Sequence, residues 1–166
     1  TTLRKVVAGK PAMIVFYRGG WCPYCNLQLQ GLRLIRERMD ALGFRMIAIS
    51  PDRPEVLRES LGGSAPDFIL VSDASAHAMQ DFGLAFRVDK MTLAKYLAYG
   101  IDLEAASGER HHALPVPGVF LVDAEGRLQF SYVHPDYKVR LPEEVIVAAA
   151  EALHAERQKL ELRRKR

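Results

Sequence analysis

Apolar residues along the chain form short runs and stripes that alternate between strand and helix periodicity. A continuous apolar run over Pro11–Tyr17 predicts a buried strand, and the mainly apolar stretches Phe44–Ser50 and Phe68–Val71 predict two further strands. Two later runs, Gly118–Val122 and Arg127–Val133, are joined by Asp-Ala-Glu-Gly and predict a β-hairpin.

Helical spacing separates these strands. After Cys25, apolar side chains recur every three or four residues, which predicts one helix over Asn26–Leu42 that ends at Gly43. Further helices are predicted over four stretches: Pro54–Leu61, Ser75–Phe82, Met91–Tyr99 and Pro142 to about Leu160.

The order of these elements predicts an α/β domain with a central mixed sheet flanked by helices. The connection from Leu84 to Pro115 is unusually long for a compact domain, and we expect it to carry structure or function. No repeat, low-complexity tract or linker divides the 166 residues, so a single domain over 1–166 is expected.

Composition and charge narrow the class of protein. With 49% hydrophobic and 26% charged residues, the chain is not intrinsically disordered, and no apolar run approaches the ~20 residues of a membrane span. The formal net charge of the chain is +3. The last ten residues, 157–166, have a net charge of +5, so the other residues together have a net charge of −2. A solvated basic helix end or tail is the favoured interpretation, and no nucleic-acid or membrane partner is predicted.

The chain has two cysteines, Cys22 and Cys25, separated by two residues. A structural zinc site needs four ligands, and the five histidines lack ligand spacing, so neither a metal nor another cofactor is predicted. A secreted disulfide framework would need more cysteines. With these alternatives excluded, the pair is interpreted as a redox dithiol, which suits a reducing compartment. Because no signal peptide is recognisable, we expect the protein in the cytoplasm.

The C-x-x-C pair stands between the first strand and the long helix. With Cys22 at the N-cap, Pro23 occupies N1, where its missing N–H costs nothing, and Tyr24 and Cys25 follow at N2 and N3. The unpaired amides and the positive end of the helix favour a thiolate at Cys22. Because Cys25 begins the buried stripe, this geometry predicts Cys22 as the attacking sulfur and Cys25 as the resolving one.

The stretch Trp21–Cys25 resembles the active site of thioredoxin-fold oxidoreductases, in the Cys-Pro-Tyr-Cys form of glutaredoxins. Phe16–Gln30, Leu114–Asp123 and His134–Tyr137 are similar to the alkyl hydroperoxide reductase/thiol-specific antioxidant family, the peroxiredoxins, whose peroxidatic cysteine falls at Cys25. The resemblance implies a thioredoxin-like fold, a hydroperoxide or disulfide substrate, and thioredoxin or glutathione as reductant. It also allows for a homodimer.

Three positions depart from the peroxiredoxin motif. Arg18 replaces its proline, Cys22 replaces its threonine or serine, and Pro117 stands where many peroxiredoxins have the arginine that polarises peroxide. Pro117 instead resembles the cis-proline that faces the dithiol in thioredoxin-fold oxidoreductases. That resemblance implies that the backbone of Val116 pairs with an extended substrate.

Other candidates have two interpretations each. Arg18 either stabilises a thiolate or peroxide oxygen, or faces solvent at a strand end. Trp21 either shields the dithiol or is simply packed. The pair His111-His112 is typical of a surface loop rather than a site, and Gly19-Gly20 permits a close approach of the backbone or a hinge.

Three functions follow from the sequence. The family resemblance favours peroxide reduction by the Cys22–Cys25 dithiol, whereas the C-x-x-C spacing and Pro117 favour disulfide reduction. A third possibility is a non-catalytic redox-sensing module that acts through Leu84–Pro115 or the basic tail. We predict a thiol-dependent antioxidant oxidoreductase and leave its substrate open at this point.

Overall fold

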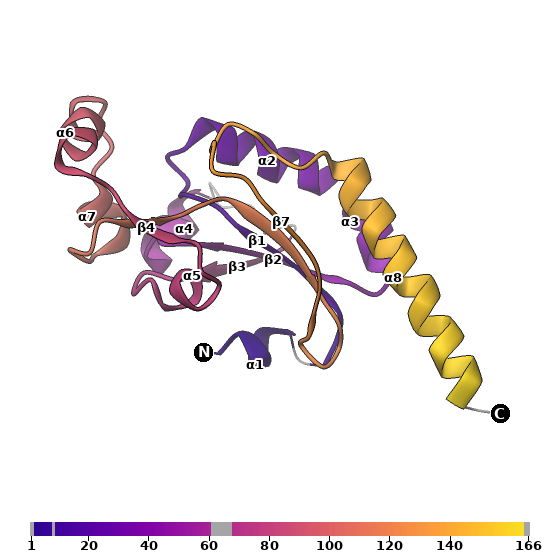
Figure 1. The fold of residues 1–166 in the computed structure, drawn as a ribbon. Helices are drawn as coiled ribbons and strands as arrows, with labels where there is room; N and C mark the ends of the chain where they lie inside the picture. Colours follow the sequence, from indigo (N-terminus) through magenta and orange to yellow (C-terminus); the bar gives the residue numbers. More distant parts are fainter. Residues whose placement is uncertain (1, 8, 61–67, 165–166) are drawn as a thin grey trace.

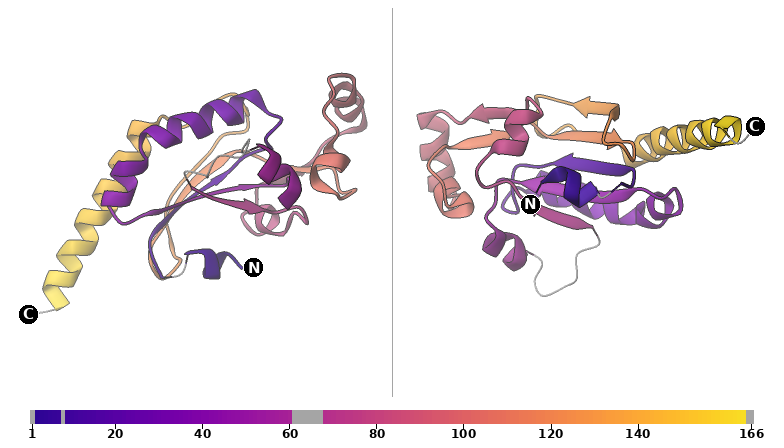
Figure 2. Two further views of the ribbon diagram at one scale, coloured as in Figure 1. Left: turned by 180° about the vertical axis from the view of Figure 1, so that it is seen from behind. Right: turned by 90° about the horizontal axis from the view of Figure 1, so that it is seen from below.

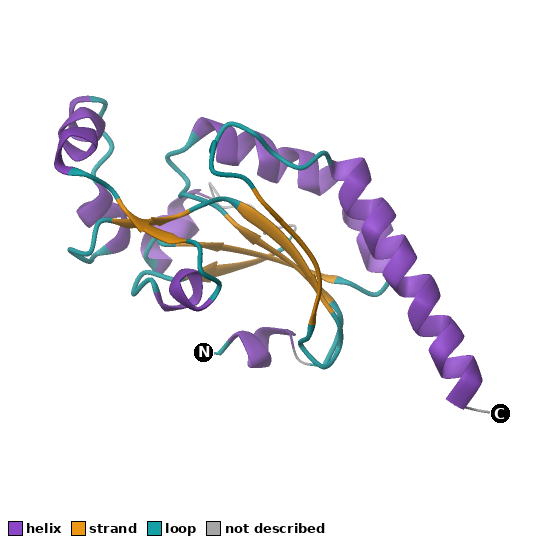
Figure 3. Ribbon diagram, viewed as in Figure 1, coloured by secondary structure: helices purple, strands orange, loops and turns teal. Residues whose placement is uncertain are grey.

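The structure is a computed structural model that describes residues 2–7, 9–60 and 68–164. Its centre is the predicted mixed sheet, whose strands are orange in Figure 3. The structure gives the strand order as β3-β2-β1-β6-β7. The strands β1, β2 and β3 run parallel, and β6 and β7 are each antiparallel to the neighbour before them. These strands are β1 (Ala12–Phe16), β2 (Arg45–Ser50), β3 (Ile69–Ser72), β6 (Gly118–Val122) and β7 (Leu128–Val133).

Helices cover both faces of the sheet (Figures 1 and 2). Met13 and Val15 of β1 pack with α2, α3 and α8 on one face, whereas Ile14 and Phe16 pack with α1 and α5 on the other. Every residue of β1 is therefore buried, which is why this strand is continuously apolar. The helices are α1 (Leu3–Val7), α2 (Pro23–Leu34), α3 (Arg36–Ala41), α5 (His77–Asp81) and α8 (Glu143–Arg164).

The long connection between Leu84 and Pro115 is structured. Its two ends pair as an antiparallel ribbon of β4 (Ala85–Arg87) and β5 (Ala113–Pro115), and between them lie α6 (Lys90–Ala98) and α7 (Leu103–Ser107). This part projects at the left of Figure 1 and has a small core of Val88, Leu103 and Leu114, against which Trp21 packs. The connection thus touches the loop that carries the dithiol.

The prediction of one continuous helix as far as Leu42 is wrong. The helix begins at Pro23, as the cap argument expects, but it breaks at Ile35, where the backbone leaves helical geometry with φ −97° and ψ 0° between α2 and α3. Ile35 is β-branched, which weakens its helix propensity. It is also buried in the same core as Leu32 and Met39, so the apolar stripe continues across the break and conceals it.

The remaining helices and strands are those predicted from the sequence, and they differ from the predictions only in where they begin or end. The hairpin of β6 and β7 and the helix α6 are confirmed, and the expected helix over Ser75–Phe82 is the shorter α5. The helix α4 (Pro54–Ser60) begins at the predicted proline, whereas Leu61 lies outside the described residues. The last helix, α8, extends beyond Leu160 to Arg164, so the basic stretch forms its final turns as far as the structure describes it.

A groove of about 620 Å³ lies away from the dithiol, between α8 and the β6–β7 turn, and is lined by Phe44, Asp123 and Arg157 among others.

In the described part of the chain, no helix is long and apolar enough to cross a membrane.

Candidate active site

The two cysteines lie at the start of α2, at the carboxyl end of β1. Cys22 is the N-cap with extended backbone angles and Pro23 is the first helical residue, as predicted. Both cysteines are thiols rather than a disulfide. Cys22 is only 2% exposed and Cys25 is fully buried, so a reagent needs a small movement of the surrounding side chains to reach either sulfur.

The expected capping hydrogen bond to the Cys22 sulfur is absent. The side chain of Cys22 makes no cap hydrogen bond, and the amide of Cys25 donates to the Cys22 carbonyl at 3.0 Å instead. The same amide nevertheless helps to lower the pKa of Cys22. The predicted position of the helix start and the direction of the amide's effect are therefore right, although the amide donates to the carbonyl rather than capping through the sulfur.

The two thiols titrate as a pair. A hydrogen bond from the Cys25 side chain lowers the pKa of Cys22 to about 6, against the opposing effect of burial, with smaller contributions from the Cys25 amide, Arg18 and Arg140. The same hydrogen bond, together with burial, raises the pKa of Cys25 far above that of an ordinary thiol. One proton therefore leaves the pair readily while the second is held between the sulfurs.

Two donors outside the pair point at Cys25. The backbone amide of Arg18 donates to Cys25 Sγ at 3.4 Å, and the guanidinium Nη2 of Arg140 donates to the same atom at 3.5 Å. Arg140 lies between β7 and α8, far along the chain from the C-x-x-C motif. The sulfur that is buried more deeply thus has the closest contact with a positive charge.

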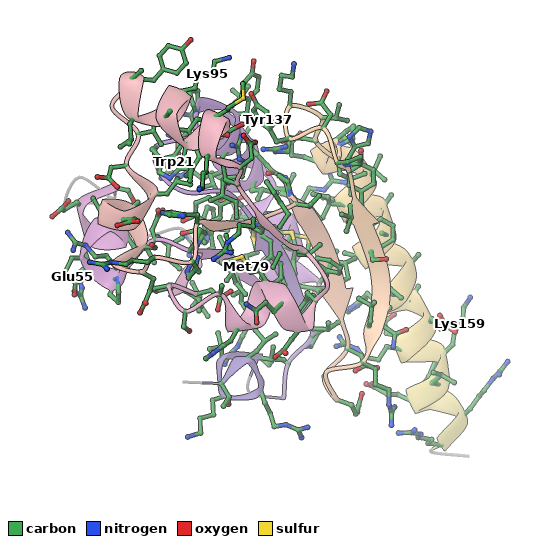
Figure 4. The ribbon with its side chains drawn as sticks, turned by 60° about the vertical axis from the view of Figure 1, so that its left-hand side comes forward. Trp21, Glu55, Met79, Lys95, Tyr137 and Lys159 are labelled. Atoms are coloured by element: carbon green, nitrogen blue, oxygen red, sulfur yellow. The ribbon has the colours of Figure 1, made fainter. Side chains whose placement is uncertain are left out.

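Arg18 is held in a cage of aromatic side chains. It is 4% exposed, and its guanidinium carbon lies 5.2 Å, 5.6 Å and 4.0 Å from the ring centroids of Trp21, Tyr96 and Tyr137. Its Nη2 also donates to the hydroxyl of Tyr96. Figure 4 shows Trp21 and Tyr137 beneath the helix that carries Lys95, which is α6. Arg18 is therefore not the solvent-facing residue of the second interpretation, and its charge contributes to lowering the pKa of Cys22, as the first one predicts.

We expect Tyr96→Phe to lower the free energy of unfolding by about 1–2 kcal/mol, because the buried Arg18 guanidinium loses a hydrogen-bond acceptor while the ring stays. Urea denaturation followed by circular dichroism measures this change. The matched control is Tyr99→Phe at the C-cap of the same helix. Its side chain is 70% exposed, and its loss of the hydroxyl should change the free energy of unfolding by less than about 0.5 kcal/mol. Equal effects of the two variants would contradict the cage.

A buried carboxylate holds the glycine loop before the dithiol. Asp52 Oδ2 accepts hydrogen bonds from the Gly20 amide at 2.8 Å and from Ser50 Oγ at 3.1 Å. Desolvation raises the pKa of Asp52 above its usual value, although both hydrogen bonds oppose this shift. At Gly19, where φ is +144°, a Cβ would lie 2.4 Å from Trp21 Nε1 and 2.8 Å from Asp52 Oδ1. The close backbone approach predicted for Gly19-Gly20 is confirmed.

The predicted cis peptide bond before Pro117 is wrong. Among the described residues no peptide bond is cis. Val116 and Pro117 carry the chain from β5 directly into β6, and the Val116 amide already donates to the Leu84 carbonyl at 2.8 Å. An extended trans link joins these two strands, and the Val116 N–H is not available to pair with a substrate strand.

The other candidates have structural partners. His112 contacts Glu104 at 2.7 Å, and His111 contacts the Ala74 carbonyl at 2.7 Å. The segment His134–Tyr137 forms a turn that brings Tyr137 against Tyr24, with ring centroids 5.6 Å apart. Within the ranges that the structure describes, His, Cys, Asp and Glu form no group of three or more that could hold a metal ion.

Four residues near the dithiol escaped sequence reasoning as site residues: Asp52, Tyr96, Tyr137 and Arg140. Asp52 directly follows the second strand, at the edge where β1 also ends, and this position was a usable signal. Tyr137 belongs to the family-like stretch His134–Tyr137, which was a usable signal as well. Tyr96 and Arg140 reach the site from distant parts of the chain, and no local pattern marks them.

The low pKa of Cys22 predicts a pH profile for alkylation. Because the thiolate is the reactive form, the rate of reaction of the reduced protein with iodoacetamide should rise with pH around a midpoint near 6. Mass spectrometry of the intact chain follows the reaction. The same chain in urea is the control, and its midpoint should return to about 8.5. A folded-state midpoint above pH 8 would contradict the shared proton.

A thioredoxin-like α/β fold with a hydrogen-bonded dithiol at the start of α2 defines a thioredoxin-fold thiol protein. The sequence profile of the AhpC/TSA family matches residues 1–131, and the chain belongs to this family.

Individual relatives agree with this assignment. Over 76 residues the chain is 34% identical to a putative peroxiredoxin of Haemophilus influenzae, a match that covers 46% of this chain and 49% of that protein. The chain thus spans about half the length of this relative.

Solved structures of peroxiredoxins share the fold. A mutant of the peroxiredoxin 6 of Arenicola marina superposes with a TM-score of 0.75 at 13% identity, covering 95% of this chain and 67% of that one. The bacterioferritin comigratory protein of Xanthomonas campestris, described for its alkyl peroxide reduction activity, superposes with a TM-score of 0.66 at 20% identity. That match covers 93% of this chain and 85% of the Xanthomonas chain.

Proposed function

We propose that this protein is a thiol-dependent peroxidase that reduces hydroperoxides and cycles Cys22 and Cys25 between dithiol and disulfide. The observation that carries the proposal is the dithiol at the start of α2, where Cys25 lowers the pKa of Cys22 and the Arg140 guanidinium contacts Cys25 Sγ at 3.5 Å. Such a pair supplies a thiolate at neutral pH, and a thiolate is the nucleophile that peroxide reduction needs.

The cycle has three steps. A thiolate of the pair attacks one peroxide oxygen; the S–O bond forms, the O–O bond breaks, and the departing oxygen takes a proton and leaves as an alcohol or water. The second cysteine then attacks the sulfenic acid sulfur and releases water, which forms the Cys22–Cys25 disulfide. Both residues lie in the first turn of α2, where their spacing suits this bond.

An external thiol must restore the dithiol in the third step. Thioredoxin or glutathione is the proposed reductant, and both are reagents of a reducing compartment such as the cytoplasm. A solved yeast mitochondrial 1-Cys peroxiredoxin, which is resolved through the glutathione and thioredoxin systems, shares the fold and supports this choice.

Protein disulfide reduction without peroxidase activity is the less favoured function. It rested on the C-x-x-C spacing and on Pro117. The spacing suits both functions, whereas the peptide bond before Pro117 is not cis and the Val116 amide already donates to the Leu84 carbonyl. A redox-sensing module has no observation of its own to favour it.

The test is consumption of hydrogen peroxide and tert-butyl hydroperoxide by the full chain, coupled to NADPH oxidation through thioredoxin and thioredoxin reductase, or through glutathione and glutathione reductase. We expect steady turnover with one of these reductants, and one disulfide per chain in the protein oxidised by a single equivalent of peroxide. Reduction of insulin disulfides without any peroxide consumption would contradict the proposal and favour the disulfide reductase.

A further inference from the structure

Asp52 is a buried ionisable group that takes no part in the proposed catalytic cycle. It is 1% exposed, and its Oδ2 accepts hydrogen bonds from the Gly20 amide and from Ser50 Oγ, neither of which carries a charge. Its other oxygen, Oδ1, is buried and has no hydrogen-bond partner among the described residues. A carboxylate held only by neutral donors is costly to bury, so stability alone does not explain its place beside the dithiol loop.

Side chains hold both polar groups of the Gly20 backbone. Asp52 accepts the Gly20 N–H at 2.8 Å, and the side-chain amide of Asn26 donates to the Gly20 carbonyl at 2.9 Å. The two side chains come from different elements, because Asp52 follows β2 and Asn26 lies in α2. Together, Asp52 and Asn26 form a clamp that fastens the loop between the sheet and the helix.

The Asp52 half of the clamp is anchored to rigid parts of the fold. Ser50, the last residue of β2, accepts a hydrogen bond from the Asp52 amide at 3.3 Å in addition to donating to its carboxylate. The next amide along the chain, that of Arg53, donates to the Ala106 carbonyl in α7 at 2.9 Å. Since Asp52 is fixed in this way, the loop can move away only by breaking its hydrogen bond from Gly20 to Asp52.

The clamped loop carries Trp21, which lies against the dithiol. Trp21 packs on the buried cluster that contains Cys22 and Cys25. A Cβ at Gly19 would approach both Trp21 Nε1 and Asp52 Oδ1 to less than 3.0 Å, so the indole and the carboxylate close on the same glycine. Release of the loop from Asp52 would therefore also release the side chain that covers the two cysteines.

We propose that Asp52 sets the size of the hydroperoxide that the dithiol accepts. While the clamp is closed, Trp21 stays against the cysteines, and hydrogen peroxide and small alkyl hydroperoxides reach a sulfur more readily than bulky aromatic ones. Opening of the loop moves Trp21 and admits the bulky substrates. This inference rests on the proposed function for its substrate class. Asp52 is a positioning residue rather than a catalytic one, because it acts through the loop.

Two neutral maleimides of different size test the clamp without any peroxide. N-ethylmaleimide and pyrene maleimide undergo the same addition to a thiolate, so the ratio of their rates reports access to the sulfurs rather than the thiol pKa. In the reduced full chain, Asp52→Ala should raise the pyrene maleimide rate relative to the N-ethylmaleimide rate about 10-fold, because the loop loses a hydrogen bond to a charged acceptor. Asp52→Asn keeps an acceptor for the Gly20 amide and should retain most of the original ratio.

Asp123→Ala is the matched control. Asp123 also holds a turn through its carboxylate, which accepts the amides of Glu125 and Arg127. Its turn lies at the opposite end of β1 from the dithiol, since Val122 pairs with Ala12 at the start of that strand. The loss of this carboxylate should leave the ratio of the two maleimide rates unchanged.

A second variant decides the question if Asp52→Ala does not fold, which circular dichroism shows. Asn26→Ala removes the other half of the clamp at an exposed position. Because this hydrogen bond joins two neutral groups, its loss should raise the same ratio of rates about 3-fold.

The corresponding comparison with substrates uses cumene hydroperoxide and hydrogen peroxide. Asp52→Ala should raise turnover of the first relative to the second about 10-fold. An unchanged maleimide ratio in Asp52→Ala, or an equal acceleration of both maleimides, would overturn the clamp whether or not the protein is a peroxidase. A raised maleimide ratio with an unchanged peroxide ratio would overturn the selection of substrates by size. A raised maleimide ratio in a chain that consumes no hydroperoxide would support the clamp and contradict the proposed function.

Discussion

Cys25→Ser should abolish hydroperoxide consumption, with a loss of about 10³-fold or more in the second-order rate constant. Serine has nearly the same shape, but its hydroxyl stays protonated at neutral pH and does not attack an O–O bond. The donors from Arg18 and Arg140 then face an oxygen that is not a nucleophile. A stopped-flow assay with one equivalent of hydrogen peroxide measures the loss directly.

Cys22→Ser is the matched control for this experiment, because it removes a sulfur from the same turn of α2 and leaves Cys25 with its two donors. If Cys25→Ser still consumed one equivalent of peroxide and Cys22→Ser consumed none, the attack would belong to Cys22. The helix-cap argument from the sequence would then be right, and the assignment of the attack to Cys25, which rests on its two donors, would be wrong.

The central part of the site could be predicted from the sequence because it is local. A buried strand, two glycines, a proline at the first helical position and an apolar stripe beyond it place Cys22 and Cys25 at a helix start, and the structure agrees. Positions within one turn of a helix are set by backbone geometry alone, so neighbouring residues are sufficient to infer them.

The chemistry of the two sulfurs could not be predicted in the same way. It depends on which distant groups reach them, and Arg140 and Tyr96 reach the site only after the chain has closed around the sheet. Only a structure places Arg140 against Cys25. The helix-cap argument considered only the amides of α2, and these amides bond to the backbone instead.

The prediction for Pro117 failed for a related reason. It was drawn from a resemblance between short motifs, but the backbone at this point is decided by the ribbon of β4 and β5, which takes the Val116 amide. Pro117 also occupies the position where many peroxiredoxins have an arginine. In this chain the guanidinium of Arg140, from the segment before α8, contacts the dithiol instead. The dithiol therefore has a neighbouring cation although position 117 has no arginine.

The long connection between Leu84 and Pro115 now has a structural role. Through Tyr96 and the packing of Trp21 against Leu103 and Leu114, it closes one side of the site around Arg18. The sheet and the N-terminus of α2 are parts that any thioredoxin-like fold provides. The aromatic cage comes from three separate parts of the chain, so it is the feature that distinguishes the surroundings of this dithiol.

Cys22→Ser should separate the first turnover from the following ones. Because Cys25 keeps its donors, the first reaction with hydrogen peroxide should stay within about 5-fold of the unmodified rate, and the protein should gain one oxygen atom as a sulfenic acid. Steady-state turnover with thioredoxin should fall about 10²-fold, because no neighbouring thiol is present to form the disulfide that a dithiol reductant attacks.

Intact mass after one equivalent of peroxide distinguishes the two proteins, since the unmodified chain should lose two hydrogen atoms where the variant gains an oxygen. Excess peroxide should carry the variant further, to the sulfinic acid, while the unmodified chain stops at the disulfide. Steady-state rates that match the unmodified protein would mean that the external thiol attacks the Cys25 sulfenic acid directly. In that case Cys22 would tune the pKa of the pair without resolving its oxidised partner, and the hydrogen bond between the thiols would be its whole contribution.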